Sequence, residues 1–205
     1  DHPEQVFTRD IGFTLGNHFF ISEMANPIRQ GEEKVLADWM NEHDIFYKKL
    51  SEHSIEGGDV IVDGHRVFIG ISHRTSMDAI KVLQKELTDF DILPIVFNPK
   101  YLHLDCVFNI LSAKDALIFP DALDKNMVEL LSSMYNLIEV SESEQFSMGT
   151  NVLSIGQNRV ISLPINHDVN LQMRQHGYQV IEVDFSEIIK SGGSFRCCSM
   201  PIERR

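Results

Sequence analysis

One pattern of apolar and polar positions occurs four times along the chain. Each copy begins with two short β-rich segments joined by a turn, continues as an amphipathic stretch with helical spacing, and ends in a short apolar strand. The β-rich pairs are predicted over residues 10–21, 59–70, 105–119 and 151–162. Gly16-Asn17 and Asp63-Gly64 are typical hairpin turns in the first two copies. The pattern therefore predicts a repeated β-β-α-β unit.

A helix and a closing strand complete each copy. Periodic apolar residues predict helices over residues 31–43, 75–87, 124–135 and 167–176. Closing strands are predicted over residues 45–47, 92–97, 137–140 and 180–183. Equivalent positions recur every 46 to 48 residues, at Asp10, Glu56, His103, Asn151 and Cys197. A period of this length is typical of repeat architectures such as rings and propellers.

A fifth copy begins near residue 193, and its helix and closing strand are missing. We expect one α/β domain over residues 1–205, with repeats near 6–50, 54–97, 101–140 and 149–183 and a partial repeat at 193–205. Either a segment before residue 1 completes the fifth repeat, or two copies of the chain cover each other's strand edges as a homodimer. The acidic stretch 139–144 is predicted to be a solvated loop.

The excess of acidic residues limits the kinds of macromolecule that the chain can bind. Asp and Glu number 30 against 18 Lys and Arg, so the formal charge of the 205 residues is -12. This balance argues against duplex nucleic acid or an anionic membrane as the main partner. The apolar runs are too short to span a bilayer, and the polar, acidic start is unlike a secretory signal. Three cysteines make no disulfide framework, so we expect a reducing, cytoplasmic location.

Acids, an imidazole and a thiol occupy equivalent places in the repeats. In a ring of repeats, the first strands would project these side chains toward one axis: Asp10, Glu56, His103, Asp105 and Cys197. Unpaired buried charge is expensive, so such a cluster is a poor hydrophobic core. It suits a bound organic cation, with a nucleophile and a proton carrier beside it.

Five motifs together resemble the guanidine-modifying superfamily, also called the amidinotransferase or pentein superfamily. They are Phe7-Thr-Arg-Asp10, Glu56-Gly-Gly-Asp59, Ser72-His-Arg-Thr75, His103-Leu-Asp105 and Gly192-Gly-Ser-Phe-Arg-Cys-Cys-Ser-Met-Pro201. The chain is most similar to dimethylarginine-hydrolase-like and arginine-deiminase members. The resemblance implies an α/β-propeller of β-β-α-β repeats with pseudo-fivefold symmetry, an active site on the axis, and a first or fifth blade that is incomplete in this chain.

The resemblance also implies catalytic roles. The nucleophile is Cys197, because Cys-x-Ser-Met-Pro aligns there, and Cys198 is expected to point the other way on a strand. His103 is the proton carrier, and Asp10 and Glu56 bind the guanidinium. Carboxylates suit that ligand because a guanidinium is a planar, cationic fork of N–H donors.

Four further residues are expected at the substrate. Asp105 is the third guanidinium-binding carboxylate that the resemblance implies. Arg29 and Arg74 follow Asp10 and Glu56 by 19 and 18 residues, and the family uses arginines there to grip an α-carboxylate. The alternative for both arginines is a surface or capping role. Asp59 either contributes to substrate binding or only fixes the loop of the Glu56 motif, and Cys106 is predicted to be a core residue.

The leading hypothesis is hydrolysis of a guanidino C–N bond in arginine or a methylated arginine, through a covalent thiouronium on Cys197. The products would be citrulline and ammonia or a methylamine. Amidino transfer to an amine is the first alternative, and a non-catalytic pentein binding module is the second. Asp105 favours an unsubstituted or singly modified guanidinium, since the familiar dimethylarginine hydrolases have lysine there. The other histidines lack metal-ligand spacing, so neither metal nor cofactor is expected.

Overall fold

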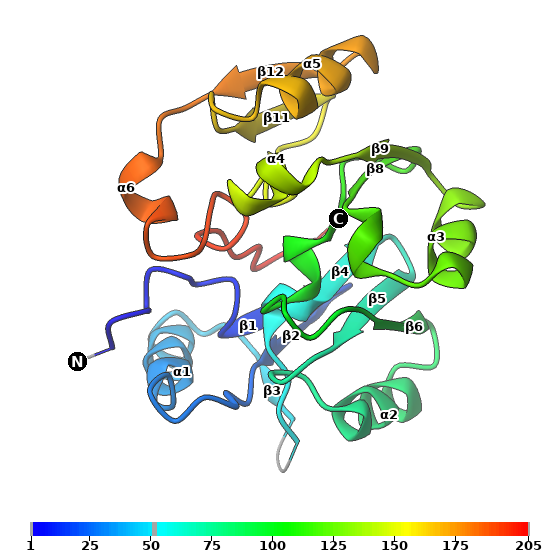
Figure 1. Cartoon of the computed structure of the whole chain (residues 1–205). Helices are drawn as coiled ribbons and strands as arrows, with labels where there is room; N and C mark the ends of the chain where they lie inside the picture. The colour runs from blue at the N-terminus through cyan, green and yellow to red at the C-terminus, as the bar shows by residue number, and fades with distance from the viewer. Residues whose placement is uncertain (1, 51–52, 205) are drawn as a thin grey trace. The chain divides into compact units, whose positions relative to one another are not determined.

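The computed structural model describes residues 2–50 and 53–204 (Figure 1). The chain folds into two compact units, one formed by Asp1–Ile95 with Cys197–Arg205 and the other by Val96–Arg196. Four three-stranded sheets lie in the part of the chain described here, one for each predicted full repeat. The predicted β-β-α-β unit is therefore confirmed, and the single domain over residues 1–205 stays a prediction.

The first two repeats have the predicted order of elements. The first consists of β1 (Gly12–Leu15), β2 (His18–Ile21), α1 (Glu32–Glu42) and β3 (Lys48–Lys49). The second consists of β4 (Val60–Asp63), β5 (Arg66–Ile71), α2 (Met77–Glu86) and β6 (Asp91–Val96). β1 and β2 form an antiparallel hairpin, and β3 returns parallel to β2 after the helix. The closing strand of the first repeat begins after the predicted 45–47.

The third and fourth repeats follow the same scheme. The third consists of β7 (Phe108–Ile110), β8 (Asp115–Ile118), α3 (Lys125–Ser132) and β9 (Asn136–Glu139). The fourth consists of β10 (Leu153–Ser154), β11 (Arg159–Ser162), α5 (His167–Gln175) and β12 (Gln179–Glu182). Short elements join them: η1 (Gly57–Asp59), η2 (Leu104–Cys106), η3 (Pro120–Ala122), α4 (Glu142–Phe146) and α6 (Ser186–Ile189).

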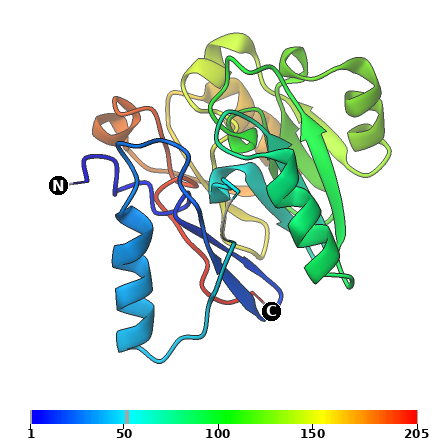
Figure 2. The same cartoon turned by 90° about the horizontal axis from the view of Figure 1, so that it is seen from below.

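The helix of a later repeat packs on the strands of the repeat before it. In the first unit, α2 joins a core with the first hairpin, built from Ala79, Ile80, Leu83, Phe13, Leu15 and Phe20. In the second unit, α5 packs on the third repeat through Val169, Met173, Leu117, Ile138 and Val140. α1 packs beside the β1–β2 hairpin (Figure 2), and the partly buried Met200 and Ile202 extend that core. Each repeat thus buries an apolar face that it could not bury alone.

Three of the sequence motifs, which end at Asp10, Asp59 and Asp105, lie just before the first strands of their repeats and not on them. Glu56 directly precedes η1 and His103 directly precedes η2, both with extended backbone. Residues 194–204 contain turns and no strand, so the expected strand alternation at Cys198 is wrong. The backbone of these segments makes isolated hydrogen bonds to a neighbouring motif, such as that from the Arg9 N–H to the Cys197 carbonyl, and not the regular hydrogen bonds of a β-sheet.

The acidic stretch is also different from its prediction. α4 begins there, capped by the Ser141 side chain. The buried Glu144 carboxylate accepts the N–H groups of Asp168 and Val169 at 2.8 and 3.0 Å. These are donors of the first turn of α5, where a carboxylate is favourable. The predicted solvated loop is therefore wrong at Glu144. Over residues 2–50 and 53–204, no helix has both the length and the apolar character needed to cross a membrane.

Candidate functional site

Asp10 lies at the end of its motif, with its carboxylate almost entirely buried. Arg29 Nη1 donates to Asp10 Oδ2 at 2.5 Å. Arg29 Nε and Nη2 donate to Glu32, which lies in the first turn of α1 and is also fully buried. Arg29 Nη2 donates further to the carbonyls of Glu4 and Phe7. The guanidinium of Arg29 thus bridges two buried carboxylates and the backbone before Asp10.

Burial and charge act in opposite directions on Arg29. Burial alone would lower its pKa, but the hydrogen bonds to Glu32 and the charge and hydrogen bond of Asp10 raise the pKa overall. The side chain is only 1% exposed, so its charge is held between the two acids. Such a pair is costly to break, because removing either partner leaves a buried charge uncompensated.

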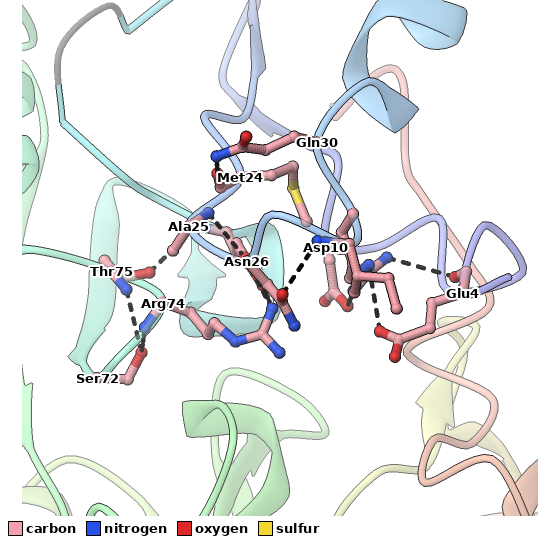
Figure 3. Close-up of polar contacts among 12 residues, drawn as sticks. Glu4, Asp10, Met24, Ala25, Asn26, Gln30, Ser72, Arg74 and Thr75 are labelled. Atoms are coloured by element: carbon pink, nitrogen blue, oxygen red, sulfur yellow. Dashed lines mark hydrogen bonds and ion pairs between the residues drawn. The ribbon is translucent and has the colours of Figure 1, made fainter. Parts of the chain in front are cut away.

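Glu56 is held by the turn that carries Arg74. Figure 3 shows Ser72, Arg74 and Thr75 of this turn, with the Ser72 side chain beside the backbone of the other two. The N–H of Glu56 donates to Thr75 Oγ1 at 3.1 Å. Arg74 Nη1 lies 3.2 and 3.4 Å from the two carboxylate oxygens of Glu56. The Ser72 hydroxyl accepts the N–H groups of Arg74 and Thr75 and donates to Asp59 at 2.6 Å. Asp59 therefore contacts the turn that carries Arg74, and both roles considered for Asp59 stay predictions.

Cys197 lies in a turn over residues 195–198 and is buried. Its carbonyl accepts the N–H of Arg9 at 2.9 Å, and Arg9 Nη2 donates to Ser199 Oγ at 2.8 Å. Cys198 is partly exposed. Burial, together with the negative charge of Asp10, raises the pKa of the Cys198 thiol.

Gly57 permits a close approach between the first two motifs. Its N–H donates to the Asp10 carbonyl at 3.0 Å. A Cβ at this position would lie 2.1 Å from the carbonyl oxygen of Arg9. The residue after Glu56 must therefore be glycine for Asp10 and Glu56 to keep this spacing.

The second unit contains the predicted proton carrier. His103 is buried, and its carbonyl accepts the N–H of Cys106 at 3.1 Å. Asp105 Oδ2 lies 3.2 Å from Arg196 Nε, and the Asp105 carbonyl accepts the Asn151 amide at 3.5 Å. The N–H of Arg196 donates in turn to the Asn151 carbonyl. Cys106 is buried, as predicted for a core residue.

The two units thus hold two sets of predicted site residues. Asp10, Arg29, Glu56, Asp59, Arg74 and Cys197 belong to the first unit, and His103 and Asp105 belong to the second. Their convergence on one axis, and the roles given to them, stay predictions. The sequence analysis gave no role to Glu32, Arg9 or Ser199. The i,i+3 spacing of Arg29 and Glu32, which form an ion pair in the structure, is the signal that could have identified Glu32.

Comparison with known proteins assigns the family. The profile described as N,N dimethylarginine dimethylhydrolase, eukaryotic, matches residues 1–204. The uncharacterised protein YkgA of Bacillus subtilis (strain 168) is 54% identical over 202 residues, which cover 98% of this chain and 71% of YkgA. An N(G),N(G)-dimethylarginine dimethylaminohydrolase of Mycobacterium tuberculosis (strain ATCC 25618 / H37Rv) is 30% identical, with 98% of this chain and 66% of that protein covered. The chain thus spans about two thirds of these relatives.

Solved structures show the same fold. The N-terminal domain of ArgZ, an arginine dihydrolase from the ornithine-ammonia cycle in cyanobacteria, matches with a TM-score of 0.90. The match is 24% identical and covers 98% of this chain and 77% of that one. More distant matches include arginine deiminases and the amidinotransferase SxtG. The predicted α/β fold of repeated small sheets is therefore confirmed, with four three-stranded sheets in the described residues and close structural matches to these domains. The chain belongs to the N,N dimethylarginine dimethylhydrolase (eukaryotic) family of the pentein superfamily.

Proposed function

We propose that the protein hydrolyses a guanidino C–N bond of arginine or a methylated arginine. The observation that carries this proposal is that Asp10 and Glu56, both buried, each bind a guanidinium of the chain itself, from Arg29 and Arg74. A buried carboxylate that accepts guanidinium N–H groups has the charge and the geometry that a guanidino substrate requires. Cys197 lies in a turn hydrogen-bonded to the residue next to Asp10.

Each step of the reaction has a residue to perform it. The Cys197 thiolate attacks the central guanidinium carbon, whose resonance otherwise makes it a poor electrophile. The C–N bond to the departing amine breaks, and His103 gives that amine its proton. The Cys197 thiouronium then remains. Water, deprotonated by His103, adds to its carbon, and the C–S bond breaks to release the ureido product and the thiolate.

Cys197 is the nucleophile in this proposal because the adjacent thiol is poorly suited to the role. Burial and the negative charge of Asp10 raise the pKa of the Cys198 thiol, which disfavours its thiolate, the nucleophilic form. A bound guanidinium would instead favour the thiolate at Cys197.

The two arginines are proposed to have different roles. Arg29 directs its donors to Asp10, Glu32 and backbone carbonyls and is 1% exposed. We therefore assign Arg29 to holding Asp10 in place. Arg74 contacts Glu56 through one nitrogen at longer distances and is 13% exposed. On binding, the substrate guanidinium would take Glu56, and Arg74 would turn to the substrate's α-carboxylate.

The proposed substrate has an unsubstituted or singly methylated guanidinium. Asp105 supports this preference, because two methyl groups on one nitrogen would remove the donors that a further carboxylate requires. Amidino transfer would instead break the C–N bond to the alkyl chain of the substrate, leaving an unsubstituted thiouronium on Cys197 that an acceptor amine resolves. The free thiols Cys106, Cys197 and Cys198 support a reducing, cytoplasmic location.

A substrate panel tests the proposal. The protein is incubated with arginine, monomethylarginine, dimethylarginine, agmatine and guanidinoacetate, with and without glycine as amine acceptor. Ureido product and released amine are both measured, and Cys197→Ser is the matched inactive control. We expect arginine or monomethylarginine to give equal amounts of both products. Absence of turnover with every compound would refute the proposal of an enzyme. Release of the substrate's alkylamine only in the presence of glycine, with no ureido product, would refute hydrolysis in favour of amidino transfer.

A further inference from the structure

Arg9 is a buried cation that none of the proposed catalytic steps uses. It is 2% exposed and directly precedes Asp10. Its backbone N–H donates to the Cys197 carbonyl at 2.9 Å, and its Nη2 donates to Ser199 Oγ at 2.8 Å. One residue therefore holds the nucleophile's turn at two points, on either side of Cys198. The two partners are 190 residues apart in sequence, so this link is purely tertiary.

The same segment is fixed on its other side. The Asp10 carboxylate is held by Arg29, and the Asp10 carbonyl accepts the Gly57 N–H at 3.0 Å. A shift of Arg9 would therefore change the position of the thiol turn relative to a carboxylate that is itself immobilised.

We propose that Arg9 is a positioning residue that, through Ser199, fixes Cys197 relative to the guanidinium-binding Asp10. The inference rests on the proposed function. Nucleophilic attack needs the sulfur about 3–3.5 Å from the guanidinium carbon and correctly oriented, and a displacement of about 1 Å can cost 100-fold in rate. A charge-assisted hydrogen bond from a rigid guanidinium is suited to such a fixed spacing.

Ser199→Ala is the principal test, because it removes one hydroxyl and leaves the buried Arg9 and its backbone bond in place. We expect kcat for the active substrate to fall 10- to 100-fold, with KM changed less than threefold. Ser199→Thr keeps the hydroxyl and should recover most of the activity. Alkylation of Cys197 by iodoacetamide without substrate should stay within about threefold of wild type, since that reagent needs no guanidinium alignment.

Ser154→Ala is the matched control. Its hydroxyl also makes one long-range hydrogen bond, to the Leu111 carbonyl at 2.8 Å, far in sequence from the motifs. Its kcat should equal that of the wild type, while its thermal midpoint falls about as much as that of Ser199→Ala. Arg9→Lys keeps the charge and the backbone N–H but loses the planar fork, and should show the same kcat-selective loss.

The outcomes separate the inference from the function beneath it. A wild type that turns over no guanidino compound refutes the proposed function and this inference together. An active wild type with an unchanged kcat for Ser199→Ala refutes the inference alone. A loss of kcat that Ser154→Ala shares, or that Ser199→Thr does not reverse, would show a general structural role and would also overturn it.

Discussion

Replacing Gly57 by alanine tests whether the spacing of the first two motifs controls catalysis. The new Cβ would lie 2.1 Å from the carbonyl oxygen of Arg9 and 2.6 Å from that of Gly12. Ordinary carbon–oxygen contacts are about 3.3 Å or longer, so the overlap with Arg9 exceeds 1 Å. Both obstacles are backbone atoms, so a side-chain rotation cannot relieve them. The Asp10 and Glu56 segments must therefore separate.

The expected effects follow from that displacement. Overpacking of this kind typically costs about 1–3 kcal/mol of unfolding free energy. For a chain of 205 residues this lowers the thermal midpoint by roughly 2–12 °C. The hydrogen bond from Gly57 to the Asp10 carbonyl is also stretched. Because a displacement near 1 Å can reduce reactivity about 100-fold, we expect kcat/KM to fall by that order.

Gly64→Ala is the control, because Gly64 has a φ of +59° and its Cβ would meet nothing within 4 Å. It should lose about 1–2 kcal/mol from the left-handed backbone alone, with turnover unchanged. Stability is measured by urea and thermal unfolding, and turnover by product release below the thermal midpoint. A Gly57→Ala protein with kcat/KM within twofold of wild type would refute the spacing argument.

Three further predictions concern charge and thiol. Cys197→Ser should abolish turnover, and Cys198→Ser should retain most of it, as measured in a steady-state assay. Loss of turnover in Cys198→Ser alone would identify Cys198 as the nucleophile. Asp10→Asn or Glu56→Gln should each lower kcat/KM roughly 10- to 150-fold, because each change removes a charge-assisted hydrogen bond to the substrate. Unchanged kcat/KM in both variants would refute the roles proposed for these two carboxylates. Burial would raise the pKa of Asp115, but hydrogen bonds lower it overall. Asp115→Asn should therefore destabilise the protein at pH 7. The difference in unfolding free energy between variant and wild type should shrink as the pH falls below about 4. Urea unfolding at pH 3–7 measures it, and a difference that stays constant over this range would contradict the prediction.

The repeat architecture could be predicted because its determinants are local. Turns such as Asp63-Gly64 define hairpins, and helical periodicity defines the segments between them. The motif segments around Glu56 and His103 were predicted as strands, and this is wrong. No local sequence pattern shows that the backbone hydrogen bonds of such a segment go to a neighbouring motif. Glu144 shows the same limit, since its carboxylate caps a helix that begins over 20 residues later. Long-range partners decide such positions.

The candidate site residues were predictable as chemical types, but their pairing was not. Arg29 and Arg74 occupy equivalent positions in two repeats, so sequence gave them one role. The structure distinguishes them by their partners. Arg29 meets Glu32 as well as Asp10, whereas the contact of Arg74 is with Glu56. The difference comes from one acid, Glu32, which lies three residues after Arg29.

That acid changes what each arginine can do when a substrate binds. A buried carboxylate that loses its cation is costly, so the departure of the Arg74 guanidinium from Glu56 is favoured when another cation replaces it. Under the proposed function, an arginine substrate would bring such a replacement at one end and a carboxylate for the displaced Arg74 at the other. Both Glu56 and Arg74 would then meet an opposite charge after the exchange. Arg29 cannot make this exchange without leaving both Glu32 and Asp10 uncompensated, so it remains with them. A neutral ligand, or a guanidine without a carboxylate, would supply at most one of these two opposite charges and should bind more weakly for that reason.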